Sequence, residues 1–93
     1  MAETDRNRAL AALRFRALGD ETRLRFLEIL SDREHTVADL MAATGLGQSL
    51  VSHHLRALRD AALVTTRRDG RWIHYALSRP TLATTRLVLY ELD

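Results

Sequence analysis

The sequence contains no cysteine. This absence excludes a disulfide framework, a thiolate metal site and a thiol-based switch. No apolar run reaches the roughly 18 residues that a membrane span requires. The charged residues near the start leave no room for the hydrophobic stretch of a signal peptide; they are Glu3, Asp5, Arg6 and Arg8. We therefore expect a cytoplasmic protein with no membrane partner.

Proline and glycine are also scarce, with one and four residues among 93. Hydrophobic residues make up 46% of the chain and charged residues 28%, which is typical of an ordinary globular protein. A chain of this length is expected to fold as a single domain over residues 1–93 and to bury only a modest share of its surface alone. Only residues 1–7 are expected to be disordered.

Lysine is absent, because all fourteen basic residues are arginine. The coding bias of a GC-rich genome would explain this, but arginine is also the better bidentate partner of phosphate and guanine. The charge is unevenly distributed. Residues 1–45 carry seven arginines and eight acids, whereas residues 46–79 carry six arginines and two acids. This local excess of positive charge predicts a polyanionic partner.

Apolar residues recur every three or four positions through the first two thirds of the chain, as they do on one face of a helix. This spacing predicts four helices, over residues 9–18, 21–30, 36–45 and 48–61. Gly19 and Asp20 separate the first two helices as a stop and an N-cap. Thr36, with Asp39 three residues later, indicates a capping box at the start of the third helix. Gly47 stands at the N-cap of the fourth helix, where it is an acceptable second choice.

The period of the pattern changes to two after residue 62. Two runs rich in β-branched and aromatic residues, 63–68 and 71–77, flank Asp69-Gly70, which is a strong hairpin signal. Pro80 precedes a last helix over residues 81–92. We therefore predict a mainly α protein with a small β-hairpin in the order α-α-α-α-β-β-α. This is a winged helix-turn-helix, with the helix-turn-helix at about 36–61 and the wing at about 63–77.

Three stretches carry a family resemblance: ALGDETRLRFLEIL (residues 17–30), TGLGQSLVSHHLRALRDAALV (44–64), with Ser52, His54 and Leu55 as its core, and RRDGRWIHYAL (67–77). Together, in this order and spacing, they resemble the ArsR/SmtB family of bacterial repressors. The resemblance implies a DNA-binding transcriptional repressor. Two positions depart from the family pattern: Ala62 stands where glycine is usual, and Gly47 replaces the usual serine cap.

In a winged helix-turn-helix, the fourth helix of this chain would enter the major groove of DNA with its N-terminal end leading. Gln48 can bond both edges of adenine, and Arg56 suits guanine or phosphate. The wing arginines are expected to grip the backbone or the minor groove. The full set predicted to contact DNA is Gln48, Ser49, Ser52, His53, Arg56, Arg67, Arg68 and Arg71. The plain alternative for such exposed residues is a solvated surface.

Other polar and aromatic residues near this surface are expected to be structural. His54 is predicted to be half-buried and to bond backbone across the motif. Trp72 and Tyr75 are predicted to support the core and the wing rather than to stack on bases. Arg59 is assigned to the solvated end of its helix.

The first and last helices, at about 8–18 and 81–92, offer more apolar surface than one small domain can cover. In the resembled family these two helices pack across a two-fold axis, so we expect a homodimer facing a pseudo-palindromic operator. The residues predicted to form its interface are Leu10, Leu13, Leu82, Leu89 and Tyr90. The alternative is that these side chains close the core of a monomer.

Many members of the resembled family release DNA when a metal binds. Their ligands are cysteines at the start of the third helix, or His, Asp and Glu along the last helix. Here residues 35–39 contain no cysteine and residues 81–93 contain no histidine. We therefore predict no cofactor and no metal site, and we leave the effector open. A metal-responsive repressor with an atypical site, an activator and a protein-binding winged helix remain alternatives; no pattern of an enzyme site is present.

Overall fold

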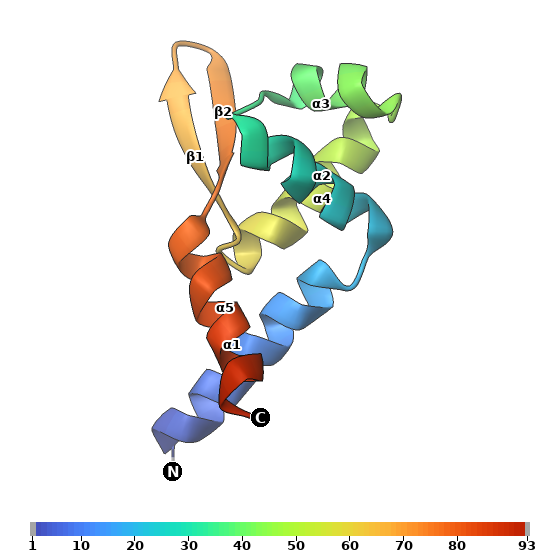
Figure 1. The fold of residues 1–93 in the computed structure, drawn as a ribbon. Helices are drawn as coiled ribbons and strands as arrows, with labels where there is room; N and C mark the ends of the chain where they lie inside the picture. The colour runs from blue at the N-terminus through green and yellow to red at the C-terminus, as the bar shows by residue number, and fades with distance from the viewer. Residues whose placement is uncertain (1, 93) are drawn as a thin grey trace.

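The elements form in the predicted order, and the computed structural model describes them over residues 2–92 (Figure 1). Their bounds are α1 Ala2–Leu18, α2 Glu21–Asp32, α3 Val37–Thr44, α4 Gln48–Asp60, β1 Val64–Asp69, β2 Trp72–Leu77 and α5 Arg79–Glu91. This arrangement confirms the predicted winged helix-turn-helix. Within residues 2–92, no helix is both long enough and apolar enough to cross a lipid bilayer.

Two helix starts differ from the prediction. Helix α1 begins at Ala2, so the expectation of disorder was wrong for residues 2–7; Met1 lies outside the described residues. No proline or glycine interrupts this stretch, and acidic residues in the first turn favour the positive end of the helix dipole. Helix α5 begins at Arg79 rather than at residue 81, because Ser78 caps it and Pro80 is tolerated within a first turn.

The predicted capping signals are present. The Asp20 carboxylate accepts from the backbone N–H of Arg23 at 3.1 Å, which caps α2. Thr36 and Asp39 form a reciprocal capping box on α3, with bonds of 3.1 and 2.9 Å. Gly45 ends α3 with a φ of 76°, a left-handed conformation that glycine adopts without strain. Local sequence therefore fixes both ends of the first helix in the helix-turn-helix.

The hairpin pairs β1 with β2 from Val64↔Leu77 to Asp69↔Trp72. Because Asp69 is already paired, the turn consists of Gly70 and Arg71 rather than of Asp69-Gly70. The connection after α2 also reaches the sheet. His35 exchanges two backbone hydrogen bonds with Tyr75, at 2.9 and 2.8 Å. The wing is therefore anchored to the start of the helix-turn-helix.

The core lies where α2, α3 and α4 meet the base of the hairpin. Its largest fully buried side chains are Phe26, Leu40, Val51, Leu55, Leu58 and Leu63. The N-terminal half of α1 and the end of α5 extend away from this core, at the opposite end of the molecule from α3 and the tip of the wing (Figure 1). The molecule measures 43 × 27 × 22 Å, so its two ends present separate surfaces.

Candidate nucleic-acid interface

Helix α4 separates its side chains into a buried face and an exposed face. Val51, Leu55 and Leu58 are buried in the core. The residues predicted to read DNA from this helix are all exposed: Gln48, Ser49, Ser52, His53 and Arg56. The structure thus places the five side chains on solvent-facing parts of one helix, with Gln48 and Ser49 in its first turn.

The N-terminus of α4 has no side-chain cap, because Gly47 provides none. The N–H groups of a first helical turn have no partner within the helix, and together with the helix dipole they favour an anion such as phosphate. The nearby Leu50 side chain is 44% exposed, and sequence reasoning did not single it out. An apolar group at this place can contact the methyl group of thymine.

A polar pocket of about 290 Å³ lies between α4 and β2. It is lined by Ser52, Leu55, Arg56, Arg59, Asp60 and Tyr75. Two guanidinium groups and two hydroxyls outnumber the single carboxylate, so the pocket suits a backbone phosphate. Arg59 was assigned to a solvated helix end; its position three residues after Arg56, and seven after Ser52, is the sequence signal for this shared face.

The three wing arginines have different surroundings. Arg67 donates from Nε to one Glu34 oxygen at 3.3 Å and from Nη2 to the other. This contact lowers the pKa of the Glu34 carboxyl through the hydrogen bonds and charge of Arg67. Arg68 and Arg71 make no ion pair within residues 2–92 and are exposed. The charges of these two arginines are therefore not paired with an acid and are available to a phosphate backbone, whereas Arg67 is already paired.

The aromatic residues of the wing also differ from one another. Tyr75 is half-buried and packs against the core, as expected. Trp72 is 49% exposed, so the expectation that it supports the core was wrong. The guanidinium of Arg71 lies over the Trp72 ring, 5.2 Å from the ring centre. This cation–π contact gives the exposed indole a favourable partner near the tip of the wing.

His54 is buried, but its partner is not the backbone that we expected. Its Nδ1 lies 3.2 Å from Nη1 of Arg23 and 3.8 Å from the Asp20 carboxylate. Burial lowers the pKa of His54, and the neighbouring charges of Arg23 and His53 lower it further against the effect of Asp20. The neutral ring therefore serves as a structural element within the helix-turn-helix. Within residues 2–92, no three His, Cys, Asp or Glu side chains gather closely enough to hold a metal ion.

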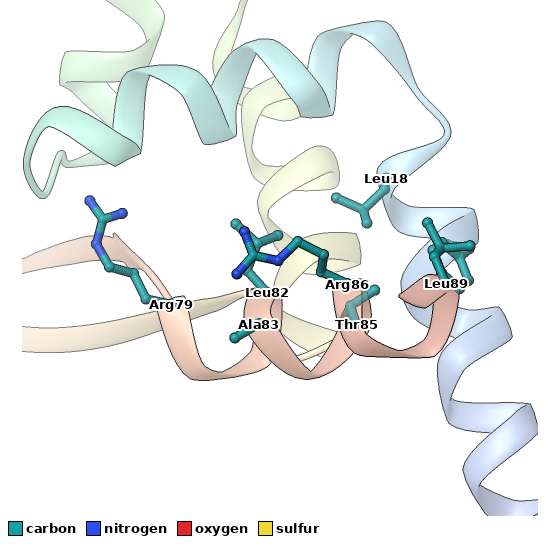
Figure 2. A pocket seen from close by; sticks show the side chains of 8 residues that line it. Leu18, Arg79, Leu82, Ala83, Thr85, Arg86 and Leu89 are labelled. Carbon is teal, nitrogen blue, oxygen red and sulfur yellow. The ribbon is translucent and has the colours of Figure 1, made fainter. Parts of the chain in front are cut away.

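A second group of exposed apolar side chains lies on α1 and α5. Of the residues predicted to form a dimer interface, Leu10, Leu89 and Tyr90 are exposed, at 41%, 57% and 76%. Leu13 and Leu82 are half-buried and pack against the core. A cavity of about 490 Å³ opens between the two helices, and its lining includes Leu18 of α1 and Leu82 and Leu89 of α5 (Figure 2).

The chain is similar in sequence to bacterial regulatory proteins. Residues 20–66 match the bacterial regulatory proteins of the arsR family. The chain is 41% identical to a probable mercury resistance operon repressor of Streptomyces lividans, and the aligned part covers 74% of this chain and 55% of that protein. It is 34% identical to the transcriptional activator HlyU of Vibrio cholerae, over 99% of this chain and 85% of that one.

A solved structure shares the fold over most of both chains. An ArsR-like transcriptional regulator from Rhodococcus sp. RHA1 is 30% identical, with a TM-score of 0.84 over 90% of this chain and 79% of that one. The chain spans about half the length of several curated relatives that it matches. The family match covers the helix-turn-helix and the start of the wing, which are the elements that carry the exposed polar face of α4. The chain belongs to the ArsR family of bacterial regulatory proteins.

Proposed function

We propose that this chain is a transcriptional repressor that binds a pseudo-palindromic DNA operator as a homodimer. The observation that carries the proposal is the exposed polar face of α4, mounted on a core that buries the opposite face. A helix presented in this way fits the major groove, where side chains reach the edges of bases. The excess of arginine in residues 46–79 supplies the attraction to phosphate.

The proposed contacts divide into reading and gripping. Gln48 can bond adenine through a pair of hydrogen bonds, and Arg56 can bond either guanine in the same way or a phosphate. Ser49, Ser52 and His53 complete the exposed set on α4. Arg68 and Arg71 hold the backbone from the wing, whereas Arg67 joins them only by leaving Glu34.

The homodimer is supported by the apolar surface on α1 and α5. Leu10, Leu89 and Tyr90 are exposed there, and the groove beside Leu18 and Leu82 is lined mainly by apolar side chains. An exposed apolar patch at one end of a small protein is typical of an interface. A second copy would present the same patch across a two-fold axis, which would place two α4 helices toward successive half-sites.

The test begins with selection of bound sequences from a pool of random duplexes, followed by a fluorescence anisotropy titration of the selected site. We expect specific binding whose affinity falls steeply with salt, because each arginine–phosphate contact releases counterions. Selection of no sequence, or an affinity independent of salt, would refute DNA reading by α4.

Activation is the second candidate, because the HlyU relative that aligns with nearly the whole chain is named a transcriptional activator. A reporter gene placed behind the selected operator separates the two. We expect expression to fall when the protein is supplied. A rise in expression would retain DNA binding and replace the repressor by an activator.

A further inference from the structure

One arginine outside the DNA face connects three elements of the fold. Arg23, in the first turn of α2, donates from Nε to the Ala17 carbonyl at 2.7 Å and from Nη2 to the Arg16 carbonyl at 3.3 Å. Both carbonyls lie at the C-terminal end of α1. Its third nitrogen, Nη1, lies 3.2 Å from Nδ1 of His54 in α4. A single planar group therefore joins α1, α2 and α4.

The chemistry of the pair fixes the direction of the bond to His54. A guanidinium has donors only, so Nδ1 of His54 must accept, and the ring proton lies on Nε2. The ring is neutral, as its burial also favours. The charged or titratable groups around it are Arg23, Asp20 and the adjacent His53, and Phe26 meets it edge-on at 5.9 Å between ring centres. Each neighbour restricts how the imidazole can turn.

The contact with α1 is favourable for a separate reason. The last carbonyls of a helix have no partner within the helix, and a cation complements the negative end of its dipole. A second arginine strengthens the same junction, because Arg14 of α1 donates to the carbonyl of Ala61 at the end of α4, at 3.2 Å. Helix α1 is thus bonded to α4 near its middle, through Arg23, and again at its end. Because these two contacts lie at different places along α4, together they restrict the angle between α1 and α4.

We propose that Arg23 is a positioning residue for DNA recognition, which through His54 sets the angle between α4 and α1. This inference rests on the proposed function above. If α1 packs across the two-fold axis, the angle between α1 and α4 determines how far apart the two α4 helices lie and how they are rotated. Arg23 would then select the spacing of the operator half-sites without contacting DNA.

The experiment compares the selected operator with versions that have one base pair added or removed at the centre. Adding one pair moves the half-sites apart by about 3.4 Å and rotates one against the other by about 35°. We expect the native protein to bind the altered operators at least about tenfold more weakly. The Arg23→Lys variant keeps the charge but lacks the planar fork. For this variant we expect less than about a threefold difference in affinity between the selected operator and the altered operators. Sedimentation should still show a dimer.

Matched variants separate positioning from mere stability. His54→Asn retains an acceptor near the place of Nδ1 and should keep the spacing preference, whereas His54→Leu removes the acceptor and should lose it. Arg25→Lys is the control on the same helix, because Arg25 is exposed and makes one 3.3 Å bond to the Ala43 carbonyl. It should leave the preference unchanged.

The possible results separate the positioning role of Arg23 from a purely structural role and from a failure of the proposed function. If Arg23→Lys weakens binding equally at every spacing, Arg23 only stabilises the fold and the positioning role is overturned. If the Arg23→Lys protein does not fold, the His54→Leu protein is tested on the same set of operators. A spacing preference as strong as that of the native protein would then also overturn the positioning role. If the native protein selects no DNA sequence at all, the proposed function fails first and this inference fails with it.

Discussion

Two regions of the molecule differ in how far they bury their apolar side chains. One is the helix-turn-helix with its wing, and the other is the pair of helices α1 and α5. In the first region, Leu40, Leu55 and Leu58 are fully buried in one core, and the exposed face of α4 is mainly polar, with Leu50 as an apolar exception. On α5, by contrast, Leu87 and Leu89 are about half exposed. The first region completes its own core, whereas the second leaves apolar surface that a further chain can cover.

The largest expected effect separates the two regions directly. Leu89→Glu places a carboxylate on the apolar surface of α5, and burying that charge without a partner in an interface is costly. We expect the dissociation constant of the dimer to rise at least about a hundredfold, as for a central interface residue. Sedimentation equilibrium measures this directly.

Ser52→Glu is the counterpart in the other region. It adds the same charge to the exposed face of α4, so it should abolish operator binding while the protein still sediments as a dimer. A Leu89→Glu protein that remains a dimer at the native concentration would remove α5 from the interface. A Ser52→Glu protein that binds DNA normally would remove that face of α4 from the DNA contact.

A smaller effect is expected from one reading side chain. Arg56→Ala removes a contact to guanine or phosphate and should weaken operator binding by about 1–3 kcal/mol. Anisotropy titration at fixed salt gives the value. Arg6→Ala is the control, since it removes one positive charge from the exposed start of α1, at the far end of the molecule (Figure 1). Equal binding constants for the native and Arg56→Ala proteins would exclude this arginine from the site.

The features that the sequence predicted well are those that short-range patterns determine. The spacing of Val51, Leu55 and Leu58 predicted which face of α4 is buried, and the pair Thr36 and Asp39 predicted where α3 begins. The disorder expected for residues 2–7 was wrong, because helix propensity in a stretch free of proline and glycine outweighed the usual fraying of a chain end.

The features that the sequence did not predict are contacts between distant residues. Arg67 meets Glu34 and Arg23 meets His54 across 33 and 31 positions. No local spacing encodes such pairs, because they exist only once α2, α4 and the hairpin have packed together. For the same reason, sequence reasoning ranked Arg67 with the free wing arginines and assigned His54 a backbone partner.

Another prediction concerns the junction between α4 and the wing. Ala62 has a φ of 59°, a left-handed conformation that costs a residue with a Cβ about 1–2 kcal/mol. Glycine adopts it freely but loses more entropy on folding. We therefore expect Ala62→Gly to raise the free energy of unfolding by roughly 0.5–1 kcal/mol. Urea unfolding at one fixed protein concentration measures it, because a dimer's stability depends on concentration.

This change should leave both the spacing preference and the dimer unaltered, since Ala62 is exposed and lies on neither proposed surface. If Ala62→Gly instead lowers stability, the left-handed residue is not strained in this turn. If it weakens the dimer, the helix-turn-helix and the α1–α5 surface are not as separate as their packing indicates.

The smallest expected effect lies at the base of the wing. Glu34→Gln removes the carboxylate that holds Arg67, and the exposed pair should contribute little to the stability of the fold. Arg67 would then be free to meet a phosphate, so we expect tighter operator binding at low salt and a salt dependence steeper by about one unit of slope. Arg67→Ala in the Glu34→Gln background should return the slope to its native value. A slope unchanged by Glu34→Gln would mean that Arg67 either leaves Glu34 freely when DNA binds or does not reach DNA. Arg67→Ala in the native background distinguishes these, because only in the first case does it make the slope shallower.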